Sequence, residues 1–419
     1  MQRDELYSVL FEQQKEFARN EMFVQRETTE SLLSSLKLKI PFIITGVRRA
    51  GKSTLLKIIK NTLNLTEKEF FYINFNDERL ISFKVEDFQK ILDFIEEEKY
   101  KQNCSLFVDE IQEVEKWEKW IDRIKDNHLC FITGSNSKLL SKEISTVLTG
   151  RSLSISLYPF SFREFLHFKK ILVDKVDKDL KVQARLRKEL TLFLELGGIP
   201  KVVTENEPRL LSELYENIIY RDIVKRFNPN LEKPIKEMSL LLLSSSGKKV
   251  SLRSLSTTLS IKNISSVKSI VDTFEKAFLF FFVPKFDFSL RKQIQNPQKV
   301  YCVDTGFITQ VGFRFSDDKG RILENMVFIE LKRQKKEIYY FSGKGECDFI
   351  LKEGVKPIAA IQVCYNLTIE NKEREIEGLI EALENFNLKD GLILTFDQED
   401  QFQIRGRKIN VLPAWKWLV

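Results

Sequence analysis

The chain has 419 residues, of which 43% are hydrophobic and 30% charged, and its formal net charge is +7. This length predicts two to four domains, and the composition excludes long disordered stretches. The mild positive charge is compatible with nucleic-acid binding and equally with an ordinary solvated surface. No apolar run approaches the ~20 residues of a membrane helix, and the charged N-terminus has no apolar signal core. We therefore expect a cytoplasmic protein with no membrane partner.

The cysteine and histidine pattern limits the chemistry. The five cysteines are scattered without a C-x-x-C pair, and the only histidines are His128 and His167. This pattern predicts buried thiols in a reducing compartment. It argues against a Cys/His zinc site and against a histidine-based triad.

The first 160 residues alternate between helical and strand-like patterns. Residues 1–38 have the spaced apolar positions of helices. The short apolar run KIPFIITG (39–46) is typical of a strand buried on both faces, and it leads through a glycine loop into a helical pattern. Alternating strands and helices predict an α/β domain with a parallel sheet. Further strands are expected at 70–75, 104–110 and 128–135, with helices at 85–99 and 117–127.

The glycine loop has the spacing of a phosphate-binding loop. Residues 46–53 read GVRRAGKS and fit G-x-x-x-x-G-K-[ST] without a gap. Gly46 and Gly51 let the backbone wrap tightly, so that its N–H groups face phosphate oxygens near a helix N-terminus. We expect Lys52 to reach the β- and γ-phosphates of ATP, and Ser53 to place its hydroxyl on Mg²⁺. The predicted nucleotide-binding residues are Gly46, Arg48, Arg49, Ala50, Gly51, Lys52, Ser53 and Thr54.

Two arginines lie inside this loop. Arg48 and Arg49 either contact phosphates or a neighbouring subunit, or they are solvated loop charges. The sequence supports both interpretations equally.

A pair of acids ends a later strand. The segment LFVDE (106–110) is an apolar run followed by Asp109 and Glu110. We expect Asp109 to hold Mg²⁺ near Ser53, and Glu110 to orient and polarise the attacking water. An ordinary strand ending in surface acids is the alternative. The phosphate loop earlier in the chain favours the catalytic interpretation.

Three further residues are candidates for catalysis. The strand CFITG (130–134) is followed by Ser135 and Asn136. One of these two would contact the γ-phosphate or the water, unless the segment is a simple turn. Arg151 is either an arginine finger acting across a subunit interface, which implies a homo-oligomer, or part of a structural salt bridge.

Several motifs then occur in the order of a known family. They are GVRRAGKST, LFVDEIQ, ITGSNS, LTGRS and LYPFSFREFL, followed by GGIP, YRDIV and VYCVDTG. The set resembles bacterial and archaeal AAA-type ATPases that carry a C-terminal PD-(D/E)XK-like domain, and the resemblance covers nearly the whole chain. In such ATPases the polar residue expected at Ser135 or Asn136 is called sensor 1.

The resemblance implies an α/β fold class: a P-loop NTPase core with a parallel sheet, a helical lid, a winged helix and a C-terminal nuclease-like α/β domain. The implied boundaries are 1–158 for the ATPase core, 159–235 for the lid, 236–290 for the winged-helix segment and 291–419 for the PD-(D/E)XK-like domain.

Residues 250–283 have the spacing of a helix-turn-helix, with helices expected near 252–259 and 265–277. The runs FLFFFV (278–283) and KVYCV (299–303) would pair as a β-ribbon wing. These features are the basis for a winged helix in this part of the chain.

Double-stranded DNA is a candidate partner of this segment. Lys262, Lys268 and Lys276 are placed to meet phosphates. Asp272 and Glu275 lie beside them, so the second helix is only weakly basic. A packing or protein-contact module is the equal alternative.

The C-terminal domain departs from the nuclease pattern. Glu324 and Asp348 match two metal-binding positions of PD-(D/E)XK nucleases, but Gln362 and Cys364 stand where the family has Glu and Lys. A glutamine lacks the negative charge that binds a metal ion, and a cysteine cannot replace a lysine cation. We expect a domain that is inactive as a nuclease, with weak metal binding still open.

Three functions follow. The first is an ATPase that couples ATP hydrolysis to a conformational switch linked to a partner such as DNA. The second is an ATP-dependent nuclease, and the third is a regulator that holds nucleotide without turnover. Intact residues at Lys52, Asp109 and Glu110 favour the first.

Overall fold

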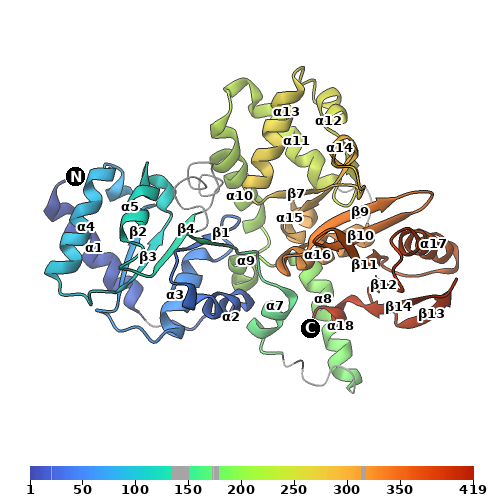
Figure 1. The fold of residues 1–419 in the computed structure, drawn as a ribbon, viewed down its shortest axis with the longest axis horizontal. Helices are drawn as coiled ribbons and strands as arrows, with labels where there is room; N and C mark the ends of the chain where they lie inside the picture. The colour runs from blue at the N-terminus through green and yellow to red at the C-terminus, as the bar shows by residue number, and fades with distance from the viewer. Residues whose placement is uncertain (20, 135–150, 172, 174–178, 313–317) are drawn as a thin grey trace. The chain divides into compact units, whose positions relative to one another are not determined.

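The computed structural model describes residues 1–19, 21–134, 151–171, 173, 179–312 and 318–419 (Figure 1). The chain divides into two compact units, Met1–Tyr158 and Pro159–Val419. None of the described helices is long and apolar enough to cross a membrane.

The described part of the first unit is built on a five-stranded parallel sheet with the order β2-β3-β4-β1-β5. The predicted α/β core with a parallel sheet is therefore confirmed. The strands are β1 (Phe42–Thr45), β2 (Phe70–Asn74), β3 (Ser105–Asp109), β4 (Cys130–Gly134) and β5 (Leu153–Ser156). The helices are α1 (Arg3–Ala18), α2 (Glu27–Ser34), α3 (Lys52–Thr62), α4 (Phe88–Glu97) and α5 (Trp117–Ile124).

Apolar side chains cover both faces of this sheet. On one face, strand residues such as Ile43 and Val108 share a buried cluster with residues of α1, α4 and α5. On the other face, Phe42, Phe107 and Phe131 stack in sequence across three strands. Strands buried on both faces read as continuous apolar runs, which is why β1, β3 and β4 were recognisable in the sequence.

Strand β5 was not predicted. It reads LSIS and lies at the edge of the sheet, where only Ile155 of its four residues is buried. It pairs with β1 in parallel, from Leu153 opposite Phe42 to Ser156 opposite Thr45. An edge strand with alternating polar residues carries a weak sequence signal, because only part of its surface packs.

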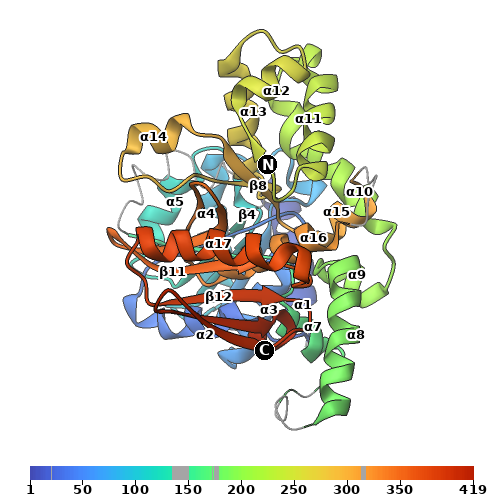
Figure 2. The same ribbon diagram turned by 90° about the vertical axis from the view of Figure 1, so that its right-hand side faces the viewer.

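The second unit begins with helices and continues into two sheets (Figures 1 and 2). Its helices before the first strand are α7 (Phe162–Phe168), α8 (Leu180–Leu196), α9 (Pro200–Glu205), α10 (Leu210–Asn217), a π-helical turn (Ile218–Ile223) and α11 (Glu232–Ser244). The later helices are α12 (Leu252–Thr258), α13 (Ile264–Lys276), α14 (Leu290–Gln295), α15 (Thr305–Gln310), α16 (Lys319–Arg333), α17 (Ile369–Asn385) and α18 (Ala414–Trp417).

In the described residues, a three-stranded antiparallel sheet joins the predicted winged-helix segment to the residues after it. Its order is β6-β8-β7, with β6 (Lys249–Val250), β7 (Phe280–Val283) and β8 (Gln298–Cys302). β7 and β8 pair, as we expected for the two apolar runs at 278–283 and 299–303. The sheet thus takes strands from both sides of residue 290.

A six-stranded mixed sheet dominates the described C-terminal part. Its order is β13-β14-β12-β11-β10-β9. Helix α17 packs on this sheet through Ile376, Leu379 and Leu383, and Figure 2 shows it lying across the face of the sheet. The strands are β9 (Glu337–Ser342), β10 (Glu346–Glu353), β11 (Lys356–Val363), β12 (Asp390–Thr395), β13 (Asp400–Ile404) and β14 (Arg407–Pro413).

Candidate functional site

The phosphate-loop sequence connects β1 to α3, and both of its glycines are required by the backbone. Gly51 directly precedes α3 with a φ of 94°, a conformation that residues with a Cβ rarely adopt. Gly46 lies against the chain that leaves β5, where an added Cβ would be 2.1 Å from the carbonyl oxygen of Leu157. The loop can therefore fold tightly around the N-terminus of α3.

Lys52, the first residue of α3, is buried inside this loop. Its Nζ donates hydrogen bonds to the carbonyl oxygens of Gly46, at 3.1 Å, and Val47, at 3.3 Å. The first N–H groups of a helix have no partner within the helix, and together with the helix dipole they form an anion site. The Lys52 ammonium and the N-terminus of α3 thus lie together and make this loop positively charged.

Arg26 supports the loop and was not predicted from the sequence. Its buried guanidinium donates to the carbonyl oxygen of Ala50 at 2.9 Å and to that of Tyr158 at 2.6 Å. It therefore ties the phosphate loop to the chain that follows β5. Arg26 lies in no motif and is distant from both partners in the sequence, so no local signal could have identified it.

The carboxylate of Asp109 lies at the end of β3, fully buried. It accepts hydrogen bonds from the hydroxyls of Ser53 and Thr133, and from Tyr72 at 3.2 Å. Burial of this carboxyl, with the neighbouring Glu110, raises its pKa, and the hydroxyls of Ser53 and Thr133 oppose that shift. The strand order β2-β3-β4 brings Tyr72, Asp109 and Thr133 together at one end of the sheet.

Glu110 follows Asp109 in a left-handed conformation, with a φ of 52°. Its backbone N–H donates to Oγ1 of Thr133 at 3.1 Å, and its side chain accepts a hydrogen bond from Gln112. Glu110 is therefore held from two sides. Gln112 and Thr133 lie within the LFVDEIQ and ITGSNS motifs, but neither residue was predicted to have a role.

The other predicted residues of this site are spread around the loop. Arg49 is exposed and Arg48 is partly buried. Ala50 is buried within the loop, Ser53 is exposed, and Thr54 is partly buried. Arg151 is 63% exposed, with its guanidinium 3.6 Å from Oδ1 of Asp122. Ser135 and Asn136 lie outside the described residues.

Of the candidate DNA-contacting lysines, Lys262 lies just before α13, and Lys268 and Lys276 lie on it. Lys262, Lys268 and Lys276 are all exposed. Asp272 is partly buried beside them. This arrangement leaves the lysines accessible to a partner without identifying one.

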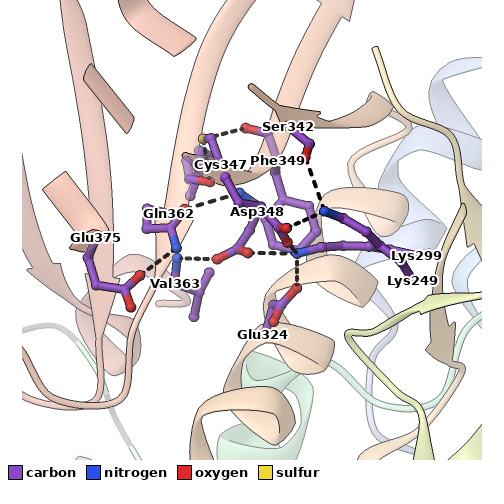
Figure 3. A network of polar contacts seen from close by, with 12 residues as sticks. Lys249, Lys299, Glu324, Ser342, Cys347, Asp348, Phe349, Gln362, Val363 and Glu375 are labelled. Carbon is purple, nitrogen blue, oxygen red and sulfur yellow. Dashed lines mark hydrogen bonds and ion pairs between the residues drawn. The ribbon is translucent and has the colours of Figure 1, made fainter. Parts of the chain in front are cut away.

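The predicted C-terminal residues form a second buried polar network (Figure 3). Glu324 lies on α16 and Asp348 on β10, and both bond to the ammonium of Lys299, at 3.0 Å and 2.7 Å. Gln362 accepts from the backbone N–H of Asp348 at 3.1 Å and donates to Glu375 at 2.6 Å. Both the oxygen and the nitrogen of the Gln362 amide therefore hydrogen-bond to other groups of the protein.

Cys364 lies just after β11, where its thiol faces the carbonyl oxygen of Asn366 at 3.0 Å. Burial raises the pKa of this thiol to about 11, so it stays protonated at neutral pH. All five cysteines are buried and unbridged, as predicted. Cys364 supplies no cation to the network.

The nuclease metal site implied by the resemblance does not fit these residues. Lys299 on β8 occupies the position between Glu324 and Asp348, and its ammonium also bonds to Glu346 at 2.8 Å. Within the described ranges, no group of three or more histidine, cysteine, aspartate or glutamate side chains is arranged to hold a metal ion. Weak metal binding at Glu324 and Asp348, which the sequence left open, is thus opposed by Lys299.

Comparison with known proteins supports the interpretation of the first unit. A family model described as an AAA domain matches residues 39–166. Two models described as domains of unknown function, DUF8612 and DUF4143, match residues 187–318 and 319–417.

Two relatives resemble the chain over nearly its whole length. The uncharacterized protein MJ1544 of Methanocaldococcus jannaschii is 35% identical, over 96% of this chain and 92% of the relative. An uncharacterized protein of Haemophilus influenzae is 30% identical, over 90% of this chain and 94% of the relative.

Solved structures match more distantly. The Thermotoga maritima RuvB Holliday junction branch migration motor is 15% identical with a TM-score of 0.28, over 64% of this chain and 94% of RuvB. The Aeropyrum pernix ORC1 protein in complex with DNA is 12% identical with a TM-score of 0.30, over 75% of this chain and 95% of that protein. Likenesses this distant carry no argument about function.

Proposed function

This chain belongs to the family of AAA-domain proteins that its full-length relatives define, and we propose that it binds Mg-ATP at residues 46–54 and hydrolyses it. The observation that carries this proposal is the convergence of three elements at one end of the parallel sheet. These are the phosphate loop with Lys52, the hydroxyl of Ser53, and the acids Asp109 and Glu110.

Each residue of the loop has a role that follows from its chemistry. The backbone N–H groups from Gly46 to Thr54 would bind the phosphate oxygens. Lys52 would exchange its neutral carbonyl partners for the β- and γ-phosphates. Arg48 and Arg49, at the outer side of the loop, would contact phosphates or a neighbouring copy of the chain.

The residues present also fit a magnesium ion. Ser53 and Asp109 already share a hydrogen bond, and hard oxygen donors of this kind are what Mg²⁺ prefers. When bound, Mg²⁺ neutralises phosphate charge and so lowers the barrier to attack by water. Tyr72 and Thr133 hold the Asp109 carboxylate in place for this task.

Glu110 is the proposed base that orients and polarises the attacking water. Gln112 and Thr133 hold it at the end of β3, next to Asp109. Ser135 or Asn136 would act as sensor 1. Arg151, exposed on the surface, would act as an arginine finger on a neighbouring copy in a homo-oligomer.

We infer that hydrolysis drives a conformational switch in the second unit, with residues 159–235 as a lid and 236–290 as a winged helix. The order α11, β6, α12, α13, β7, α14, β8 supports the latter, because a helix-turn-helix beside an antiparallel sheet is the arrangement of a winged helix, here with β8 lying beyond residue 290. The exposed lysines Lys262, Lys268 and Lys276 support double-stranded DNA as the partner. The C-terminal nuclease-like domain, residues 291–419, would serve binding and not cleavage.

The test is ATP turnover by the purified full chain, with and without double-stranded DNA. We expect turnover in the wild type, its loss in Lys52→Ala and Glu110→Gln, and a changed rate when DNA is added. Tight ATP binding without turnover, with or without DNA, would replace this proposal with a nucleotide-holding regulator. ATP-dependent DNA cleavage would favour the nuclease instead.

A further inference from the structure

Three carboxylates surround one ammonium in the second unit. The ammonium of Lys299 lies 3.0 Å from Glu324 and 2.7 Å from Asp348 (Figure 3). It also lies 2.8 Å from Glu346, so its three N–H donors face three different acids. We call Glu324, Glu346 and Asp348 the carboxylate cluster. Lys299 is only 2% exposed, and Glu324 and Asp348 are buried with it, whereas the side chain of Glu346 is 39% exposed.

The cluster is held in a fixed orientation by further donors. Tyr301 donates to Oε1 of Glu324 at 2.6 Å, and the backbone N–H of Val363 donates to Oδ2 of Asp348 at 2.9 Å. Lys249 donates to Glu346 at 2.6 Å from the outer side. These contacts aim one oxygen of each acid at a common point, as outer hydrogen bonds do around a bound cation.

The ammonium comes from a different sheet from two of the acids. Lys299 lies on β8 of the three-stranded sheet, Asp348 and Glu346 lie on β10 of the six-stranded sheet, and Glu324 lies on α16. A cation at this point therefore fastens three elements of the second unit to one another. Without it, the buried carboxylates of Glu324 and Asp348 would lose the cation that they share, which is strongly unfavourable.

We propose that the Lys299 ammonium is the resident cation of the carboxylate cluster, in the position that a divalent metal ion would otherwise take. Nζ lies within 3.0 Å of all three acids, so a metal ion bound to the same oxygens would overlap it and repel its charge. The second unit accordingly holds this cluster together without a metal. These three acids do not form a metal site as they stand, and we expect removal of the Lys299 side chain to let Mn²⁺ or Mg²⁺ bind their oxygens.

Two substitutions of Lys299 separate the effect of its positive charge from the effect of the volume that its side chain fills. Lys299→Ala removes the cation and opens room for an ion, whereas Lys299→Met removes the charge but still fills the space. We expect both to lower the melting temperature of the full chain by about 10 °C. The matched control is Lys249→Ala, whose partly exposed ion pair with Glu346 should be worth less than about 2 °C.

The decisive measurement is Mn²⁺ binding to the full chain without nucleotide, by electron paramagnetic resonance and calorimetry. Lys299→Ala should bind Mn²⁺ and regain melting temperature with it. Lys299→Met, and Lys299→Ala combined with Asp348→Asn, should do neither. A folded Lys299→Ala protein that binds no Mn²⁺ would overturn the proposal.

Mn²⁺ binding by the wild type tests the proposal even if the alanine variant does not fold. We expect its Mn²⁺ binding to be the same with and without the substitution Asp348→Asn, because Lys299 already fills the site. Wild-type binding that Asp348→Asn abolishes would show that a metal ion displaces Lys299, and the proposal would be wrong.

Discussion

Lys52 in the first unit and Lys299 in the second are both buried, but their surroundings differ in the ability to accept a ligand. Lys52 is 5% exposed and donates to two neutral backbone carbonyls, while Lys299 is 2% exposed and donates to three carboxylates. An incoming phosphate can replace carbonyl partners at a small cost, because these carry no net charge. Three acids already balance Lys299. Burial alone does not separate the two lysines, because the Lys52 charge acts on Asp109 from a distance whereas the Lys299 ammonium directly contacts three acids.

The largest expected effect is the loss of Lys52 itself. Lys52→Ala should lower ATP turnover about 1,000-fold, because the cation that meets the developing phosphate charge is gone. Phosphate release at saturating ATP measures this. Lys57→Ala is the control, since Lys57 lies on the same helix and pairs with Glu21 at 2.9 Å. Turnover retained in Lys52→Ala would place the chemistry elsewhere.

Glu110→Gln should lower turnover about 100-fold or more while leaving ATP affinity nearly unchanged, because only the base is removed. Binding of a fluorescent ATP analogue, measured beside phosphate release, separates the two effects. Glu113→Gln provides a matched control a turn later in the chain. Equal losses of binding and turnover in Glu110→Gln would mean that Glu110 shapes the loop instead of activating water.

The carboxylate cluster should respond to pH through Glu324. Its burial beside Asp348 raises its pKa from the ordinary 4.5 to about 7. The folded chain then binds the proton more tightly than the unfolded chain, so the free energy of unfolding falls as pH rises from about 4.5 to about 7. The loss amounts to at most about 3 kcal/mol and is complete above that window.

Denaturant unfolding at pH 5 and pH 8 measures this loss. Glu324→Gln should flatten the difference between the two pH values, because the amide does not titrate. It still offers an oxygen to Tyr301 and Lys299, so the contacts persist. The same pH dependence in wild type and variant would show that another group is responsible.

Thr133 offers a smaller test of the nucleotide site. Thr133→Val keeps the shape of the side chain but removes the hydroxyl that bonds to Asp109 and to the N–H of Glu110. We expect about a tenfold fall in kcat with ATP affinity almost unchanged, because the two hydrogen bonds that position the acids are lost. Rescue by Thr133→Ser would show that the hydroxyl, and not the packing, matters.

The smallest expected effect is that of Lys249→Ala. Lys249 and Glu346 are 35% and 39% exposed, so their ion pair is screened by water. The free energy of unfolding should change by less than about 0.5 kcal/mol. A loss comparable to that of Lys299→Ala would mean that the outer lysine shares the role of resident cation.

Much of the first unit could be predicted from the sequence, because its signals are local. The loop at 46–53 has a fixed spacing, and β1, β3 and β4 are continuous apolar runs. Thr133 was inside a predicted strand, but its role depends on the neighbouring strand β3, which the strand order alone brings next to it.

The residues that could not be predicted act over long separations in sequence. Lys299 meets Glu324 and Asp348, which lie 25 and 49 residues further along the chain. Arg26 reaches Tyr158 across 132 residues. A single sequence contains no pattern that links such positions, since their proximity results from tertiary packing.

Because Gly46 lies so close to Leu157, substitutions at position 46 should be tolerated less often than substitutions at position 52. An added Cβ at Gly46 would clash with the backbone of Leu157, whereas a substitution at Lys52 would change only side-chain contacts. In a library of variants selected only for protein abundance, Gly46 should stay invariant while position 52 drifts toward other residues. In a library selected for ATP turnover, both positions should stay invariant, and position 52 alone would distinguish the two kinds of selection.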